Sequence, residues 1–156
     1  MKKFLKYLSI LIIVLAGIYL LGWGIMKYEQ WHGQKRVQEL AQELERIERE
    51  QYEKKKADTI GGQTPQETLE MFISAVEKGD YELASKYFVI EKQEQWKNHL
   101  PEIANAQKIE TFLGPLREAK NSEGEYSLDK KSYNIHNPIL VSFVFYPSGN
   151  WKIEEI

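Results

Sequence analysis

Cysteine is absent from the 156-residue sequence. Its absence excludes disulfide bonds and thiolate chemistry, and it excludes a lipid-modified cysteine as a membrane anchor. Any domain in this chain must therefore be held together by its hydrophobic core. The sequence also lacks the motifs by which nucleotide-binding, metal-dependent and covalent catalytic sites are recognised.

Histidine is scarce, and basic residues are not gathered into a stripe. His32, His99 and His136 lie far apart, without an i,i+3 or i,i+4 pair, so we predict no metal site and no cofactor. From Pro65 onward the chain has ten Lys or Arg and fifteen Asp or Glu, a net charge of −5. This balance excludes nucleic acid from the partners that we predict.

Charge is missing altogether from Tyr7–Met26, a run of twenty residues. As a helix this run would be roughly 30 Å long, which matches the hydrocarbon core of a bilayer. A cleaved signal peptide is the alternative, but its apolar region would be shorter, about 7–15 residues. We therefore predict that residues 1–26 are an N-terminal tail and a retained transmembrane helix, with the lipid bilayer as its partner.

The flanks of this run bear on its orientation. Aromatic residues stand at both ends, where their rings favour the headgroup layer; they are Tyr7, Trp23, Tyr28 and Trp31. Three basic residues lie close to each side, so the positive-inside rule does not decide. A short basic tail before a first apolar segment is typical of a signal anchor. We therefore predict a single-pass protein of the cell membrane, N-terminus in the cytoplasm and the rest extracytoplasmic.

Residues 27–57 are predicted to form one charged helical stalk. Its apolar residues have the 3-4-3 spacing of a coiled-coil seam; they are Val37, Leu40, Leu44 and Ile47. The seam fails at the next positions, Gln51 and Lys54. Two heptads are marginal by themselves, so a solvated stalk is favoured and a weak homodimer through the stalk is the alternative.

Residues 58–63 contain two glycines and no periodicity, which predicts a linker. The domain is then residues 64–156, expected to fold by itself from about Gly62. Thr64 and Pro65 suit the N-cap and the first position of a helix, and Glu67 suits a capping box.

Helical patterns precede strand patterns within the domain. Further helices are expected at Tyr81–Phe88, around Trp96–Ile103 with an interruption at Pro101, and around Ile109–Leu116 with a bend at Gly114-Pro115. Strands are expected at Glu125–Leu128, Tyr133–His136, Ile139–Tyr146 and Trp151–Ile156. This order predicts an α+β domain with helices on one face of an antiparallel sheet.

Three segments of the domain resemble a known family. Thr64–Phe72 and Glu77–Ala84 resemble the opening of nuclear transport factor 2-like domains, in which two helices joined by a Gly-Asp turn lead into a curved sheet. Tyr146–Ile153 is similar to the closing hairpin of small bacterial secreted members, many of unknown function. The resemblance implies a small α+β roll over residues 64–156, in which Trp151 closes the sheet over the first helix.

Aromatic residues of the domain are either its core or the lining of a pocket. The candidate lining residues are Trp96, His99, Tyr126, Tyr133, Phe143 and Trp151. Enzymes of the same superfamily use a carboxylate or a histidine inside an apolar cone. Here the acidic residues fall on polar helix faces or in turns, and Asp80 is expected to cap a helix. We therefore predict no catalytic residue.

The leading hypothesis is a membrane-anchored, non-catalytic interaction module with a protein partner in the cell envelope. One alternative is a small cone-cavity enzyme of the polyketide cyclase or ketosteroid isomerase type, and another is a structural spacer that dimerises through its stalk. A polar group in an apolar, ligand-sized pocket would favour the enzyme. A filled core with an exposed apolar patch would favour the interaction module.

Overall fold

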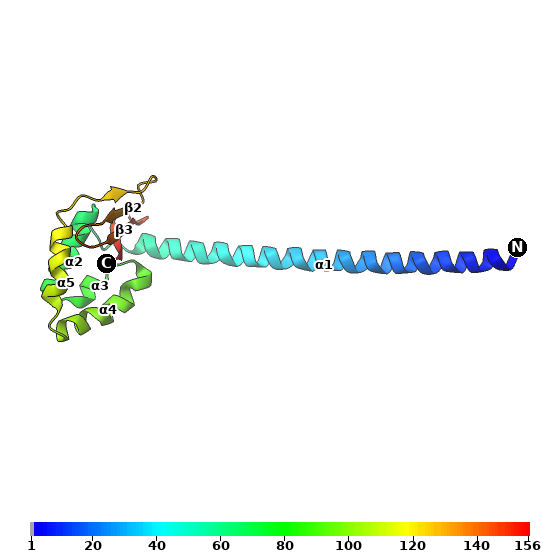
Figure 1. The fold of residues 1–156 in the computed structure, drawn as a ribbon, viewed down its shortest axis with the longest axis horizontal. Coiled ribbons are helices and arrows are strands. Elements are labelled where there is room, and N and C mark those ends of the chain that lie inside the picture. The colour runs from blue at the N-terminus through cyan, green and yellow to red at the C-terminus, as the bar shows by residue number, and fades with distance from the viewer. Residues whose placement is uncertain (1) are drawn as a thin grey trace. The chain divides into compact units, whose positions relative to one another are not determined.

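The computed structural model describes residues 2–156, and within the first helix it describes the side chains of residues 12–24, 27 and 35 onward. The chain divides into two compact units (Figure 1), of which the first ends at Glu50 and the second is Gln51–Ile156.

Helix α1 (Lys2–Ala57) is continuous over 56 residues. The predicted tail, anchor and stalk thus belong to one helix. The four seam residues Val37, Leu40, Leu44 and Ile47 are 42–67% exposed. A search of the described residues finds no helix with the length and apolar character needed to cross a membrane. Within the run Tyr7–Met26 the described side chains are those of residues 12–24, and the transmembrane helix stays a prediction.

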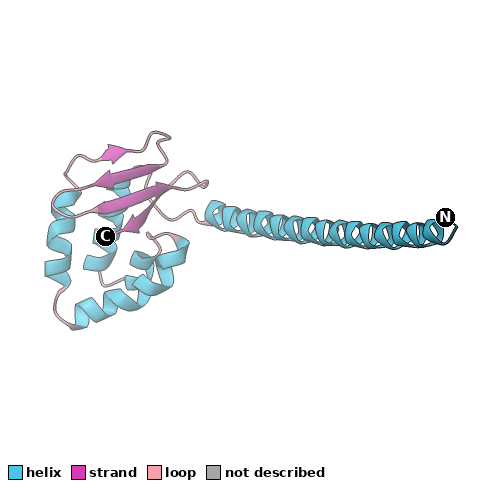
Figure 2. Ribbon diagram, turned by 45° about the vertical axis from the view of Figure 1, so that its right-hand side comes forward, coloured by secondary structure: helices cyan, strands magenta, loops and turns pink. Residues whose placement is uncertain are grey.

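The sheet of the second unit has four antiparallel strands in the order β1-β2-β3-β4. They are β1 (Glu125–Tyr126), β2 (Ser132–Ile135), β3 (Val141–Phe145) and β4 (Trp151–Glu155). Tyr133 is paired with Phe143, and Phe143 with Ile153, so these three buried side chains share one face. Helices gather on one side of the sheet in Figure 2, as the sequence predicts for an α+β domain.

The first helix of the domain, α2 (Pro65–Glu77), begins as expected. Thr64 Oγ1 accepts a hydrogen bond from the Glu67 N–H at 3.1 Å. The Glu67 carboxylate reaches the N–H of Gln63 at 2.7 Å, one residue before the position that a capping box uses. Asp80 caps α3 (Tyr81–Ser85) through a 2.9 Å bond from the Leu83 N–H, which confirms its predicted role.

Two prolines lie inside the remaining helices, α4 (Ile90–Asn105) and α5 (Ile109–Ala119). The predicted interruption at Pro101 is wrong, because α4 continues through it, and α5 likewise runs through Gly114-Pro115. A proline removes one backbone donor from a helix. Leu100 and Leu116, next to the two prolines, are fully buried, and this packing outweighs the lost hydrogen bond.

The core is one continuous cluster between the helices and the sheet. Its fully buried apolar members include Leu69, Phe72, Phe88, Leu100, Leu116, Ile135, Phe143 and Ile153. The Phe72 ring meets the rings of Phe88 and Phe112 edge to face, with centroids 5.3 and 6.3 Å apart. Side chains thus fill the space between the helices and the sheet.

Candidate functional site

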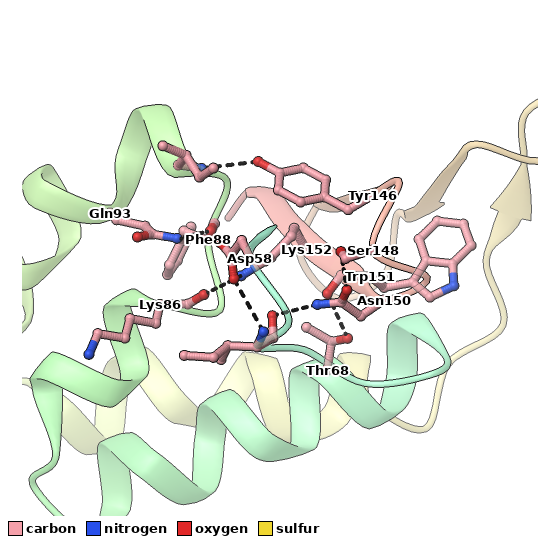
Figure 3. Close-up of polar contacts among 12 residues, drawn as sticks. Asp58, Thr68, Lys86, Phe88, Gln93, Tyr146, Ser148, Asn150, Trp151 and Lys152 are labelled. Atoms are coloured by element: carbon pink, nitrogen blue, oxygen red, sulfur yellow. Dashed lines mark hydrogen bonds and ion pairs between the residues drawn. The ribbon is translucent and has the colours of Figure 1, made fainter. Parts of the chain in front are cut away.

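The segment Asp58–Gly62, which we call the strap, follows the end of α1 and lies along β4 (Figure 3). The Trp151 N–H donates to the Gly62 carbonyl at 2.9 Å. The Asn150 side-chain amide donates to the Ile60 carbonyl at 2.8 Å. Most of the predicted linker is therefore bonded to the edge of the sheet, within the unit that begins at Gln51.

The two glycines of the strap are required by close packing. Gly61 has a φ of +145°, and a Cβ there would collide with the carbonyl oxygen of Trp151. A Cβ on Gly62 would lie 2.7 Å from the backbone nitrogen of Thr68. The sequence analysis took these glycines as a sign of a linker, and in the structure they allow the backbone to approach its neighbours.

Lys152 forms an ion pair with Asp58, the first residue of the strap, whose side chain is 12% exposed. The Lys152 side chain is fully buried, and its Nζ donates to Asp58 Oδ1 at 2.6 Å and to the Lys86 carbonyl at 2.7 Å. Burial lowers the pKa of Lys152, and the bond to Asp58 opposes that shift. A buried ammonium group is costly unless it is paired, so Asp58 is what makes this position tolerable for lysine.

The Asp58 carboxylate also joins two further parts of the domain. Oδ1 accepts from the Ile60 N–H at 3.2 Å, and Oδ2 accepts from the Gln93 side-chain amide at 3.0 Å. Gln93 donates in addition to the Phe88 carbonyl at 3.1 Å. One carboxylate thus connects the strap, α4 and β4.

Tyr146 belongs to the same cluster of polar groups, which we call the polar junction and which also contains Asp58, Gln93 and Lys152. Lys152 Nζ lies 5.7 Å from the centre of its ring, and Lys55 Nζ lies 5.6 Å from it. Its hydroxyl accepts from the Ile90 N–H at 3.1 Å, at the start of α4. Burial raises the pKa of Tyr146 to about 12. Lys55, near the end of α1, is also paired with Glu91 at 2.9 Å, which ties the end of the helix to α4.

The side chains of the polar junction bind one another through hydrogen bonds, an ion pair and a cation–π contact. Among the described residues, every buried side-chain nitrogen or oxygen has a hydrogen-bond partner. The junction therefore holds the end of α1, α4 and β4 together, and it presents neither a free base nor a free acid to a ligand.

A second feature is a partly exposed cluster of rings at one end of the sheet, which we call the aromatic edge. It consists of Tyr126, Phe145 and Trp151. The Trp151 ring centre lies 5.3 Å from that of Phe145 and 5.9 Å from that of Tyr126. Trp151 is only 6% exposed, whereas Phe145 is 41% and Tyr126 is 54% exposed. Trp151 is thus the base of this edge and the other two rings are its surface.

The six predicted pocket-lining residues fall into two groups. Trp96 and His99 lie on α4, where Trp96 stacks on Phe88 with centroids 4.4 Å apart. The other four lie on the sheet, where neighbouring rings contact one another; they are Tyr126, Tyr133, Phe143 and Trp151. Tyr133 also accepts hydrogen bonds through its hydroxyl, from the Gln66 side chain at 2.7 Å and the Gly124 N–H at 2.8 Å.

Three open hollows on the helical side are lined by other residues. One of about 420 Å³ lies between α2 and α5, and Arg117 is one of the residues that line it. Arg117 is paired with Glu77 and with Glu110, both at 2.8 Å. Two hollows of about 290 and 520 Å³ lie beside the same helix α2. None of the six candidate residues lines any of the three.

Sequence reasoning missed the residues of the junction and of the strap contacts; these are Asp58, Thr68, Gln93, Tyr146, Asn150 and Lys152. A lysine between two apolar residues of a terminal strand is ordinarily placed on the solvent face. Lys152 is instead fully buried, with its Nζ bonded to Asp58 and to the Lys86 carbonyl and close to the Tyr146 ring. The only local signal was Asp58, a carboxylate placed directly after the last helical residue.

Comparisons with known proteins add no relative: no family model, no curated protein and no solved structure matches the chain. The nuclear transport factor 2-like roll therefore stays a prediction from the sequence.

Proposed function

We propose that this protein is a single-pass membrane-anchored interaction module. Its N-terminal helix would hold a small α+β domain of the nuclear transport factor 2-like type outside the cytoplasmic membrane. There the domain would bind a protein partner of the cell envelope without catalysing a reaction.

The aromatic edge is the observation that supports binding. Tyr126 and Phe145 expose about half of their surface beside the buried Trp151, over a core that is filled by side chains. Leu128, fully exposed, follows Tyr126 by two residues. Large aromatic residues that are fixed by a rigid base and half open to solvent are typical of the centre of a protein interface.

Site-specific photo-cross-linking in intact cells tests the binding proposal. A photoreactive residue in place of Tyr126 or Phe145 should give the same adduct with one partner. The control position is Met71, an exposed apolar residue on α2 that lines one of the hollows on the helical side. With the cross-linker at Tyr126, Phe145→Ser should lower the yield of the adduct. No adduct at either edge position, or equal adducts at Met71, would contradict the proposal.

The uncharged run Tyr7–Met26 is what supports the anchor. Leu15→Arg would place a charge near the centre of the run, which costs about 2.5–3.5 kcal/mol on insertion scales. Carbonate extraction of membranes should then release more of this variant than of the control Val37→Arg, which alters the stalk. A wild-type protein that is soluble and shortened at its N-terminus would overturn the anchor.

A homodimer through the stalk is the second candidate, and the exposed seam from Val37 to Ile47 favours it. Membrane anchoring would raise the local concentration of stalks and help them to pair. Since the chain has no cysteine, Leu44→Cys introduces a single thiol on the seam. Oxidation should then trap a disulfide-linked dimer, whereas Gln42→Cys on the opposite side of the helix should not. Equal trapping of both would show random collision instead of a seam.

A further inference from the structure

The strap connects the end of α1 to the strand that carries the base of the aromatic edge. Asp58 is the residue after Ala57, where α1 ends, and its carboxylate is bonded to Lys152 of β4. Trp151 precedes Lys152 in the same strand. A disturbance at the end of the helix therefore reaches the aromatic edge within a few residues of chain.

We infer that the ion pair between Lys152 and Asp58 is a latch, which holds the strap on β4 and thereby fixes Trp151 in the aromatic edge. With the latch closed, the Trp151 N–H is bonded to Gly62, and the Trp151 carbonyl accepts from the Thr68 hydroxyl at 3.2 Å. With the latch open, the strap leaves, and the backbone of Trp151 loses the first of these partners. The effect on binding rests on the proposed function, since it takes the aromatic edge as the contact surface.

The hydrogen bonds of β4 make such an opening local. The two ends of the strand have different neighbours on the side away from β3. Trp151 is held by the strap, whereas Ile153 is bonded to Tyr87 and Val89, in both cases at 2.9 Å. Loss of the strap thus frees the Trp151 end of β4 and leaves the Ile153 end in place.

The strap is held by the polar contacts of Asp58 and of its backbone, and by Ile60, which packs against the core. Its glycines have no side chain to bury, and Asp58 carries bonds to Lys152, Gln93 and the Ile60 N–H. When one member of a buried ion pair is removed, the other remains as an uncompensated charge. Loss of the Asp58 charge therefore favours the state in which water reaches Lys152, and this is the open latch.

Amide hydrogen exchange of the full chain in detergent micelles tests the latch. Asp58→Asn keeps the shape of the side chain and removes its charge. We expect the Trp151 amide to exchange at least about tenfold faster, a change on the scale of one lost charged hydrogen bond. The amides of Ile153 and Leu113 should be accelerated less than that of Trp151, because the rest of the domain stays folded when the strap opens. The matched control is Glu77→Gln, which neutralises the carboxylate of an exposed pair with Arg117 and should change none of the three.

Two results would overturn the latch. Equal acceleration at Trp151, Ile153 and Leu113 would mean that the ion pair stabilises the domain as a whole. An unchanged rate at Trp151 would mean that the pair does not hold the strap. Should Asp58→Asn fail to fold, Gln93→Ala removes only one donor from the carboxylate and should produce the same pattern in weaker form.

Cross-linking at Tyr126 separates this inference from the proposed function. In the Asp58→Asn variant the yield of the partner adduct should fall, together with the faster exchange at Trp151. If the wild-type chain gives no adduct while the exchange pattern appears, the binding proposal fails and the latch stands. If the adduct forms but exchange at Trp151 is unchanged, the latch fails and the binding proposal stands.

Discussion

The rings of Phe88 and Trp96 lie almost parallel, with centroids 4.4 Å apart and an angle of 13° between their planes. Phe88 is fully buried, and the Trp96 ring covers it from α4. This stack supports a core role for Trp96, which the sequence analysis also considered as part of a pocket.

Trp96→Ala should therefore destabilise the domain by about 3 kcal/mol, since it removes the stack and leaves a cavity over Phe88. His99→Ala is the control, because this half-exposed side chain lies at the edge of the indole and its loss should cost under about 0.5 kcal/mol. Urea unfolding followed by circular dichroism measures both. Similar losses for the two variants would contradict the core role.

Trp151→Ala should cost about 3–5 kcal/mol, most of the stability of a domain this size. The indole is almost fully buried against Phe145 and Tyr126. Phe145→Ala, at a more exposed position, should cost less, about 1 kcal/mol. Thermal melts of the two variants and the wild type measure these two losses of stability. A shift of only a few degrees for Trp151→Ala would place the indole on a surface instead of in the core.

Gly61→Ala should cost more than about 2 kcal/mol, because both its φ of +145° and the adjacent Trp151 carbonyl disfavour a Cβ. Gly79→Ala separates the two causes. Gly79 also has a positive φ, +73°, but a Cβ there would meet no atom within 4 Å. Its cost should be about 1 kcal/mol. Equal losses in chemical denaturation would show that the strap has room to move away from β4.

The strap also changes the expectation for a shortened chain. A fragment from Gly62 lacks Asp58 and leaves Lys152 buried without its carboxylate, which costs about 3–5 kcal/mol. A fragment from Gln51 keeps the ion pair and should melt cooperatively at a higher temperature. Circular dichroism melts of the two fragments test this. Identical melting temperatures would mean that the domain does not need the strap.

Stability at alkaline pH should depend on Tyr146. Burial raises the pKa of its hydroxyl to about 12, while a tyrosine in the unfolded chain loses its proton near pH 10. The stabilisation is fully present below about pH 10 and is lost as pH rises toward about 12, an amount of about 2–3 kcal/mol. The pKa of Lys152 is lowered, so its effect on stability has the opposite sign. Below its ordinary value of 10.5, this group makes the free energy of unfolding rise with pH.

Tyr146→Phe isolates this contribution. It should flatten the decline in the free energy of unfolding between about pH 10 and 12, as measured by urea unfolding at several pH values. Absorbance of tyrosinate reports the titration directly. A slope as steep as in the wild type would show that another group controls alkaline unfolding.

Local patterns in the sequence predicted much of the domain because each depends on neighbouring residues. Thr64 and Asp80 are caps, since their side chains reach an N–H three residues away. Three of the four strands lie within the expected segments, and β2 begins one residue before its expected segment, at Ser132. The proline in α4 was misjudged because its cost is local, whereas the burial of Leu100 that offsets it comes from the tertiary fold.

The junction could not be predicted for the same physical reason. Asp58 and Lys152 are 94 positions apart, and nothing near either residue indicates the other. The glycines of the strap gave a misleading signal, because flexible linkers and closely packed backbones both require small residues. Tyr126 and Phe143 were both candidate lining residues, but only the fold shows that Tyr126 is half open and that Phe143 is buried.

The two-residue length of β1 bears on how this protein behaves when many copies share one surface. An exposed edge strand is a template on which another chain can add, and a long apolar edge leads to aggregation. Here the edge strand is only Glu125–Tyr126, and it carries a charge. At the opposite side the strap and residues 87–89 already occupy hydrogen-bonding groups of β4. Crowded copies are thereby protected from joining sheet to sheet, and contacts between side chains remain the route by which they can associate.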